Sequence, residues 1–176
     1  MRPLVTLSDL ANYKYIADSI RNSALWPLCV SEAQQLDVKI WLGDALLNEI
    51  ISQSETSPES LSALNETLLN GGTYTYQTNT YLFQGLKACI IYYAFSRFTS
   101  RMPYNYTQAG LTIKDSDLST PASDKAVQRL STESMLTAAA LRDEVLLYLK
   151  RNSASYPLFK CNSGAIRPRT FYAMGD

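Results

Sequence analysis

The most apolar continuous stretch of the chain runs from Thr80 to Arg101, and a polar, aromatic and turn-rich stretch follows it up to Asp117. Apolar residues recur at helical spacing along two stripes, Leu82–Leu86–Cys89–Tyr93 and Phe83–Ile90–Ala94–Phe98. A helix that is apolar on more than one face is buried among several partners. The pattern therefore predicts a central buried helix over 80–101, which Pro103 brings to an end.

Three helices are predicted before this central one, and the first two lie within residues 6–51. The first begins near Thr6 or Ser8, because either hydroxyl can cap a helix. Pro27 should break any helix that runs through it, so the second helix is expected to begin after it, at Ser31. This second helix continues to Ile51. Gly43 interrupts an otherwise strong helical pattern at a cost of about 1 kcal/mol relative to alanine. Close approach of a neighbouring helix would explain that glycine.

Two more helices complete the predicted bundle. A short one is expected over 58–69, with Pro58 in its first turn and Gly71 just past its end. A long one begins at the Ser123 cap and carries apolar residues at three- and four-residue steps as far as Leu149. Its charged residues occupy the opposite positions, so we expect it to pack lengthwise against the central helix.

The remaining stretches lack helical periodicity. Residues 73–79 alternate polar and aromatic side chains, which suits a short strand or an extended linker. Residues 104–118 suit an extended loop or a short β-hairpin, with a brief apolar alternation near its centre. From Arg151 onward the chain is irregular yet rich in apolar residues, so the tail docks either on its own domain or on a partner.

These patterns predict a mainly α fold, a helical bundle of four to five helices. The helical domain covers residues 1–152, with the loop or hairpin inserted at 103–121, and an extended C-terminal arm covers residues 153–176. Met1–Leu10 lacks the apolar core of a signal peptide, and no apolar run is long enough to predict a membrane span.

Composition narrows the function classes. Lys+Arg and Asp+Glu are equal at 16 each, which argues against bulk electrostatic binding of nucleic acid or anionic membranes. The chain has no histidine, the commonest general base and metal ligand. Cys29, Cys89 and Cys161 are widely spaced, which predicts packed, reduced thiols rather than a disulfide framework or a zinc site.

Candidate catalytic motifs are weak. The glycine pair at 71–72 lacks the lysine of a phosphate-binding loop, and neither GxSxG nor HExxH occurs. Acidic pairs are interpreted as turn-forming or solvated residues rather than general acid–base or magnesium sites; they are Glu55/Glu59, Asp115/Asp117 and Asp143/Glu144. We therefore expect no enzyme activity, no metal and no cofactor.

Protein contacts are the better candidate for function, because arginine and aromatic side chains are the usual interface hot spots. The candidate partner-binding residues lie in the 104–118 loop and in the tail: Tyr104, Tyr106, Leu111, Ile113, Tyr156, Leu158, Phe159, Arg167, Arg169, Phe171 and Tyr172. The tail could also bind single-stranded nucleic acid through its mixture of cations and rings. The zero net charge favours a protein partner.

Three stretches resemble one known family. AQQLDVKIWLGDALLNEI (33–50), LKACIIYYAFSRFTSRMPYNYTQAGLTIKDSD (86–117) and AALRDEVLLYLKRNSASYPLFKCN (139–162) occur in the order found in head–tail connector proteins of tailed bacteriophages. These proteins are also called adaptor or neck-ring proteins. The text is most similar to the ring proteins of crAss-like phages. Residues 52–79 are the least distinctive part.

The resemblance implies a structural virion protein that forms a twelve-subunit ring at the neck, extends the DNA channel and offers a tail-docking surface. The implied partners are further copies of the chain, the portal protein and neighbouring neck or tail rings. Genomic DNA would pass through without sequence-specific binding, and no membrane is involved. The implied location is the virion, after synthesis in the host cytoplasm.

Two alternatives stay open. The chain could be a helical protein–protein adaptor or regulatory factor unrelated to virions, or a nucleic-acid-binding module that uses the tail. Under the connector interpretation, deleting residues 155–176 should spare the fold and abolish assembly.

Overall fold

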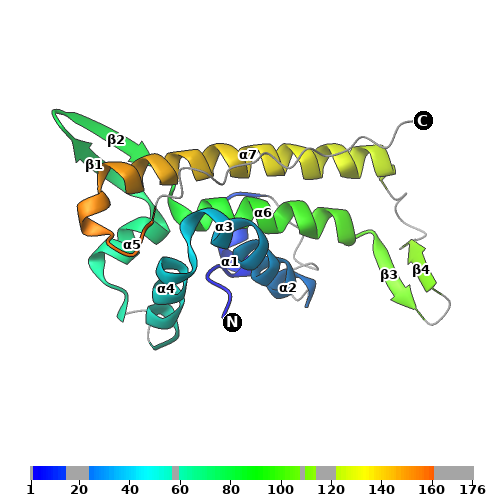
Figure 1. Cartoon of the computed structure of the whole chain (residues 1–176). Helices are drawn as coiled ribbons and strands as arrows, with labels where there is room; N and C mark the ends of the chain where they lie inside the picture. The colour runs from blue at the N-terminus through cyan, green and yellow to red at the C-terminus, as the bar shows by residue number, and fades with distance from the viewer. Residues whose placement is uncertain (1, 15–23, 57–59, 108–109, 114–121, 161–176) are drawn as a thin grey trace.

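The computed structural model describes residues 2–14, 24–56, 60–107, 110–113 and 122–160. The fold is mainly α, as predicted. Two long helices, α6 (Gly85–Arg101) and α7 (Asp124–Arg151), lie side by side and form the most extensive contact between helices (Figure 1). With 28 residues, α7 is about 42 Å long, so the pair forms the long axis of the molecule.

The N-terminal helices cover the side of α6 that faces away from α7 (Figure 1). They are α1 (Leu7–Ala11), α2 (Leu25–Glu32), a π-helical turn (Ala33–Val38), α3 (Lys39–Leu42), α4 (Asp44–Thr56) and α5 (Ala63–Asn70). Ten residues of α6 are buried, on more than one face of the helix. The prediction of a central helix surrounded by partners is therefore confirmed.

Helix caps follow the sequence closely. Thr6 caps α1 through a capping box, in which its hydroxyl accepts from the Asp9 amide and the Asp9 carboxylate accepts from the Thr6 amide. Ser123 caps α7 by accepting from the Ala126 amide at 3.3 Å. The caps predicted at Thr6 and Ser123 are confirmed, because cap residues act locally and need no tertiary contact. The helix start predicted at Ser31 is wrong, because Ser31 lies near the end of α2, which begins at Leu25.

Pro27 does not break a helix, so that prediction is wrong. It is the third residue of α2, which begins at Leu25. The first four backbone N–H groups of an α-helix have no intrahelical acceptor, so a proline in the first turn forfeits no hydrogen bond. Trp26 beside it is almost fully buried and meets Phe98 edge to face, which anchors this turn on α6.

Gly43 has a different role from the predicted one. It adopts φ +89°, ends α3 and separates it from α4, and a Cβ placed there would meet open space. No helix approaches it closely, so the predicted reason for the glycine is wrong. A positive φ is costly for other residues, and the predicted continuous helix over 31–51 is therefore divided at this point.

The predicted start of the central helix is also wrong. Strand β2 (Asn79–Phe83) occupies the first part of the apolar stretch and pairs antiparallel with β1 (Gly72–Tyr76) through a two-residue turn. Leu82, assigned to a helical stripe from sequence, is exposed on this hairpin. The strand alternative for residues 73–79 is correct as far as Tyr76.

Two glycines hold the base of this hairpin together. Gly71 ends α5 with φ +80°, as the sequence predicted, and Gly85 begins α6 with φ +80°. A Cβ on Gly85 would lie 2.3 Å from the Gly71 nitrogen, so the two backbones cross at a distance that only glycine permits. The short helix α5 begins at Ala63, after a Ser62 cap; Pro58 lies outside the described residues.

The π-helical turn carries a buried polar residue that fixes the N-terminal segment. The Gln34 side chain is fully buried, and its carbonyl oxygen accepts from the Leu4 amide at 2.8 Å. Its amide group donates to the Arg2 carbonyl at 3.3 Å. The Gln34 side chain thus holds the segment before α1 through two backbone hydrogen bonds.

Two of the three cysteines are buried free thiols, as predicted. Cys29 and Cys89 lie in the core, where burial raises the pKa of both thiols. Cys161 lies outside the described residues. No helix in the described part of the chain is long and apolar enough to cross a membrane.

Candidate interaction surfaces

Acidic side chains do not assemble into a reactive site in the described part of the chain. No group of three or more Cys, Asp or Glu residues there could hold a metal ion. Asp143 and Glu144 are exposed on α7, and Asp143 accepts two hydrogen bonds from its neighbour Arg142. Glu55 accepts from the backbone amide of Arg2. Glu59, Asp115 and Asp117 lie outside the described residues.

The second hairpin extends past the end of α6 (Figure 1). It consists of β3 (Tyr104–Thr107) and β4 (Gly110–Ile113), within the region for which the sequence predicted a loop or hairpin. The register pairs Tyr104 with Ile113 and Tyr106 with Leu111. The four candidate residues thus form two directly opposite pairs in the register, two positions apart on each strand.

One hydrogen bond described in the structure ties this hairpin to the helices. The Tyr104 hydroxyl donates to the Asp124 carboxylate, 2.9 Å away, in the first turn of α7. The hydrogen bond and the negative charge of Asp124 raise the pKa of the Tyr104 hydroxyl. The Tyr104 ring is only partly buried, so this hydrogen bond orients the start of the hairpin without burying it.

The first part of the tail packs on its own domain. Tyr156 and Phe159 are only 3% and 9% exposed and belong to the hydrophobic core. The Tyr156 hydroxyl donates to the Leu64 carbonyl at 2.7 Å, and the Tyr148 hydroxyl lies 3.0 Å from it. These two candidate residues therefore face the core, and residues 153–160 join the helical domain instead of standing apart as an arm.

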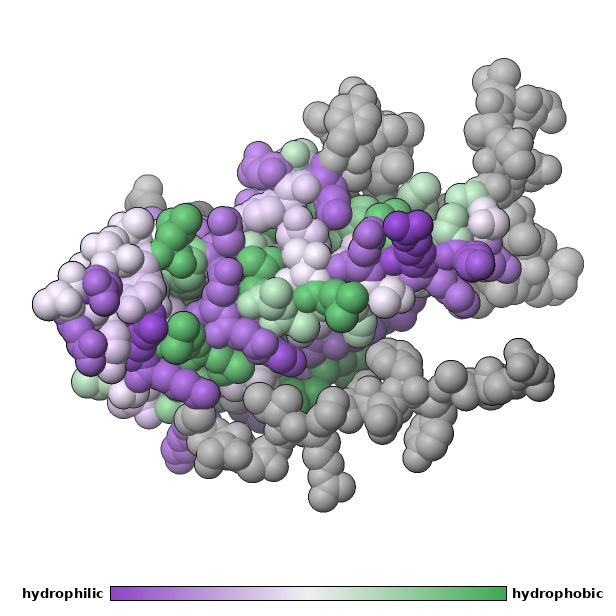
Figure 2. Space-filling model, turned by 90° about the horizontal axis from the view of Figure 1, so that it is seen from above, coloured by the Kyte–Doolittle hydropathy of each residue, from purple (hydrophilic) through white to green (hydrophobic). Residues whose placement is uncertain are grey.

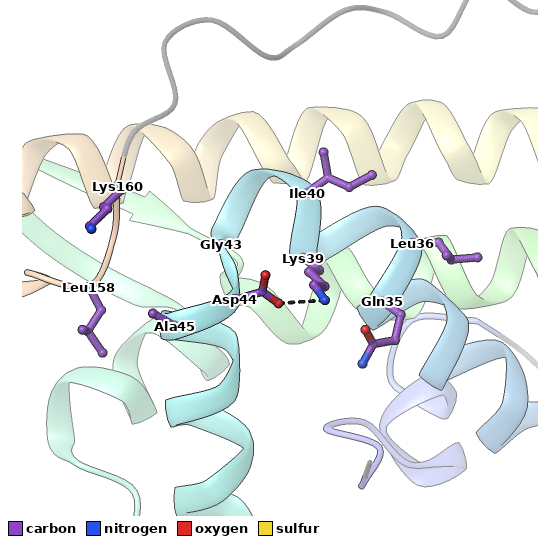
Figure 3. A pocket seen from close by; sticks show the side chains of 9 residues that line it. All are labelled: Gln35, Leu36, Lys39, Ile40, Gly43, Asp44, Ala45, Leu158 and Lys160. Atoms are coloured by element: carbon purple, nitrogen blue, oxygen red, sulfur yellow. Dashed lines mark ion pairs between the residues drawn. The ribbon is translucent and has the colours of Figure 1, made fainter.

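Leu158, between them, points outward and lines an open groove of about 650 Å³ (Figure 3). Three exposed apolar residues border it: Leu36 (48% exposed), Ile40 (57%) and Leu158 (40%). Lys39 and Asp44 form an ion pair of 2.8 Å across the Gly43 turn, and Lys160 stands on the side of Leu158. The candidates Arg167, Arg169, Phe171 and Tyr172 lie outside the described residues.

A tyrosine cluster supports the first hairpin from α7. The Arg151 guanidinium lies 3.9 Å from the ring centroid of Tyr81 and donates to the Tyr74 hydroxyl at 2.9 Å. Tyr148 stacks on Phe83 with centroids 4.2 Å apart. Cation–π and ring–ring contacts of this kind each contribute about 0.5–1.5 kcal/mol. The cluster therefore fixes β1–β2 on the C-terminal end of α7.

Sequence reasoning missed several exposed apolar side chains. Leu130, Leu136 and Leu147 are exposed along α7, and Leu36 and Ile40 line the groove. Figure 2 shows hydrophobic patches separated by hydrophilic ones on this face of the molecule. Leu136 and Leu147 lie off the apolar stripe 127–130–134–138–141–145–148, and that position is the sequence signal that could have found them. Leu130 belongs to the stripe, which is buried from Ser134 onward at Ser134, Ala138, Val145 and Tyr148, so no such signal marks it.

A charged network joins the π-helical turn to α6. Arg97 donates two hydrogen bonds to Asp37, at 3.2 and 2.6 Å, and Arg101 donates to Glu32 at 2.9 Å. The hydrogen bond from Arg101 lowers the pKa of the Glu32 carboxyl. All four charges are paired within the network, which points to a structural role in fixing the N-terminal helices on α6.

A model of a family of unknown function, DUF6712, matches residues 38–169. The chain belongs to this family. The match begins at the end of the π-helical turn and includes both hairpins, α6 and α7. It also includes the groove residues from Lys39 onward, whereas Gln35 and Leu36 precede it. No curated protein and no solved structure matches the sequence. Membership in DUF6712 therefore gives the chain a family but no activity.

Proposed function

We propose that this DUF6712 protein is a structural subunit of the head–tail connector of a tailed bacteriophage. Copies of it form a ring in the neck, between the portal protein and the tail, which extends the DNA channel and gives the tail a docking surface. The protein acts in the virion through protein contacts and performs no catalysis.

The observation that carries this proposal is the position of the three connector-like stretches in the fold. Residues 33–50 span the π-helical turn, α3 and most of α4. The stretch over 86–117 spans nearly all of α6 and both strands of the second hairpin, and the stretch over 139–162 spans the second half of α7 and the packed part of the tail. Three stretches that are separate in the sequence thus supply the central helix pair, the helices that cover it and the projecting hairpin β3–β4.

The arrangement of rigid and projecting parts also supports the proposal. The α6–α7 pair places one hairpin near each of its ends (Figure 1). In a ring, neighbouring subunits meet through two different surfaces, so a subunit needs complementary features on separate sides. The exposed apolar residues on α7 supply surface for such contacts.

Electron microscopy of the purified protein, alone and mixed with a portal protein, tests the proposal. Rotationally symmetric rings are expected. A double variant, Leu111→Lys with Ile113→Lys, should abolish ring formation and leave the circular dichroism spectrum unchanged. Thr112→Lys is the matched control, because the intervening strand position lies on the other face of the hairpin.

The alternatives give different outcomes in the same experiments. Binding to DNA or RNA that weakens steeply with salt, without rings, would favour the nucleic-acid-binding module. A defined complex of low stoichiometry with a non-virion protein would favour the adaptor. The truncated protein used to test assembly should retain residues up to Lys160 and lack residues 161–176. A deletion from residue 155 would remove the buried Tyr156 and Phe159 from the core.

A further inference from the structure

The groove between α3 and the packed tail combines three features that point to an occupant. It is open, its volume of about 650 Å³ falls in the range of about 300–1,000 Å³ typical of binding pockets, and apolar side chains dominate its rim. Leu36, Ile40 and Leu158 come from two separate parts of the chain and are all at least 40% exposed. Exposed apolar clusters of this kind usually mark a binding surface.

The chain itself reaches this groove. Tyr156 and Phe159 anchor the tail in the core, while Leu158 and Lys160 line the groove from the same short segment (Figure 3). The chain therefore continues from the rim of the groove at residue 161. A chain extends by at most about 3.3–3.6 Å per residue, so the stretch from Cys161 to Tyr172 has ample length to cross the groove.

The chemistry of that stretch matches the groove. Ile166, Phe171 and Tyr172 can fill an apolar surface, and the segment has no acidic residue before Asp176. Its cations, Arg167 and Arg169, would meet the largely exposed carboxylate of Asp44. Lys39 already forms an ion pair with the Asp44 carboxylate, so a bound arginine would be the second cation on it. Ion pairs at such exposed positions contribute little to the free energy of binding. Apolar contact is thus the main source of binding.

We propose that the segment 161–176 binds back into the groove of its own chain, between α3 and Leu158. The covalent link to the groove favours this segment over the same segment of a second copy. A short flexible tether gives a local concentration in the millimolar range, whereas separate copies meet at micromolar concentration in dilute solution. A contact of even weak affinity is therefore filled by the tethered segment first.

Disulfide trapping tests this assignment in the full-length chain. The background is Cys161→Ser; Cys29 and Cys89 are fully buried and stay unreactive. The test variant adds Ile40→Cys in the groove and Phe171→Cys in the segment. The control replaces Ile40→Cys with Leu64→Cys, which is similarly exposed at 47% and lies close to Tyr156, at the start of the tail but outside the groove.

The expected result is a disulfide within one chain that forms about tenfold faster in the test variant than in the control, because binding raises the local concentration at Ile40 above that of a free tether. Peptide mapping under non-reducing conditions identifies the bond. Equal rates in the two variants, or no bond, would overturn the proposal. A bond between two chains would overturn it in favour of a second copy as the occupant.

Discussion

The two hairpins of the molecule have strands of similar length but different support. Hairpin β1–β2 rests on α7 through the stacked rings of Phe83 and Tyr148 and through Arg151, which contacts three tyrosines. Hairpin β3–β4 is tied to α7 by the hydrogen bond from Tyr104 to Asp124. Within the described residues it has no extensive contact with any helix.

Under the proposed function, this difference assigns the first hairpin to folding and the second to assembly. A two-stranded hairpin on its own is at best marginally stable in water, so each hairpin needs a surface to pack on. The first obtains that surface from its own chain and is part of the fold. The second extends past α6, and its register pairs Tyr104 with Ile113 and Tyr106 with Leu111. Under the proposed function, it meets a partner. The predictions that follow separate these two roles.

Tyr148→Ala should have the largest effect, because Tyr148 is the centre of the support under β1–β2. Its ring contacts Phe83, Tyr74 and Tyr156, with centroids 4.2, 5.0 and 5.8 Å away. Removal of a buried aromatic ring typically lowers the free energy of unfolding by about 3–5 kcal/mol. Urea unfolding monitored by circular dichroism measures this loss. A loss below about 1 kcal/mol would show that the hairpin does not depend on α7.

Gly85→Ala should destabilise the base of the same hairpin by about 2–4 kcal/mol, from the positive φ and from the clash with the Gly71 backbone. Gly43→Ala is the matched control. It has a similar φ of +89° but open space around the added methyl group, so only the cost of the dihedral angle remains. Equal losses of unfolding free energy in the two variants would contradict the close crossing of the backbones.

The sequence predicted the helical class, the caps at Thr6 and Ser123 and the glycine end of α5 because these depend on local chemistry. The prediction was wrong at Pro27 and at Asn79–Phe83, where the local structure depends on contacts with other parts of the chain. A proline is harmless in a first turn, and the start of that turn is set by Trp26 packing on Phe98. Strand β2 forms because β1 lies beside it and α7 supports the pair.

The candidate site was predictable in part. The alternation around Leu111 and Ile113 indicated a hairpin, and the structure places Tyr104 and Tyr106 in register with them. Burial of Tyr156 and Phe159 was not predictable, because periodicity does not tell a docked tail from a free one. The groove was missed because its rim joins residues more than a hundred positions apart, Leu36 and Leu158.

Tyr156→Phe should lower the free energy of unfolding, because it removes the hydroxyl that links the packed tail to Tyr148. Tyr156 donates to the Leu64 carbonyl, so the Tyr148 hydroxyl donates to Tyr156 and would lose its acceptor. A buried polar group left unpaired costs about 1–3 kcal/mol. The same measurement, urea unfolding at neutral pH, tests this loss, and Tyr148→Ala sets its upper bound.

The pH dependence of this variant gives a second test. Burial raises the pKa of Tyr156 above its ordinary value of 10.0. Above that pH the unfolded chain loses the proton while the folded chain keeps it, so wild-type stability falls as the pH rises. From about pH 9 to about pH 11 the wild type should lose about 1.4 kcal/mol more than Tyr156→Phe. Parallel stability curves would contradict the burial of this hydroxyl.

Removing one hydroxyl from each hairpin should have the smallest effects and gives the most direct comparison. Tyr74→Phe deletes the acceptor of Arg151, and we expect a loss of about 0.5–1.5 kcal/mol in unfolding free energy. Tyr104→Phe deletes the donor to Asp124 at an exposed site, and we expect no measurable change in unfolding but weaker ring assembly, because the hairpin loses its fixed orientation. Urea unfolding and quantitative electron microscopy of both variants check these outcomes. If Tyr104→Phe destabilised the monomer more than Tyr74→Phe, β3–β4 would belong to the fold, and the division between a folding hairpin and an assembly hairpin would fail.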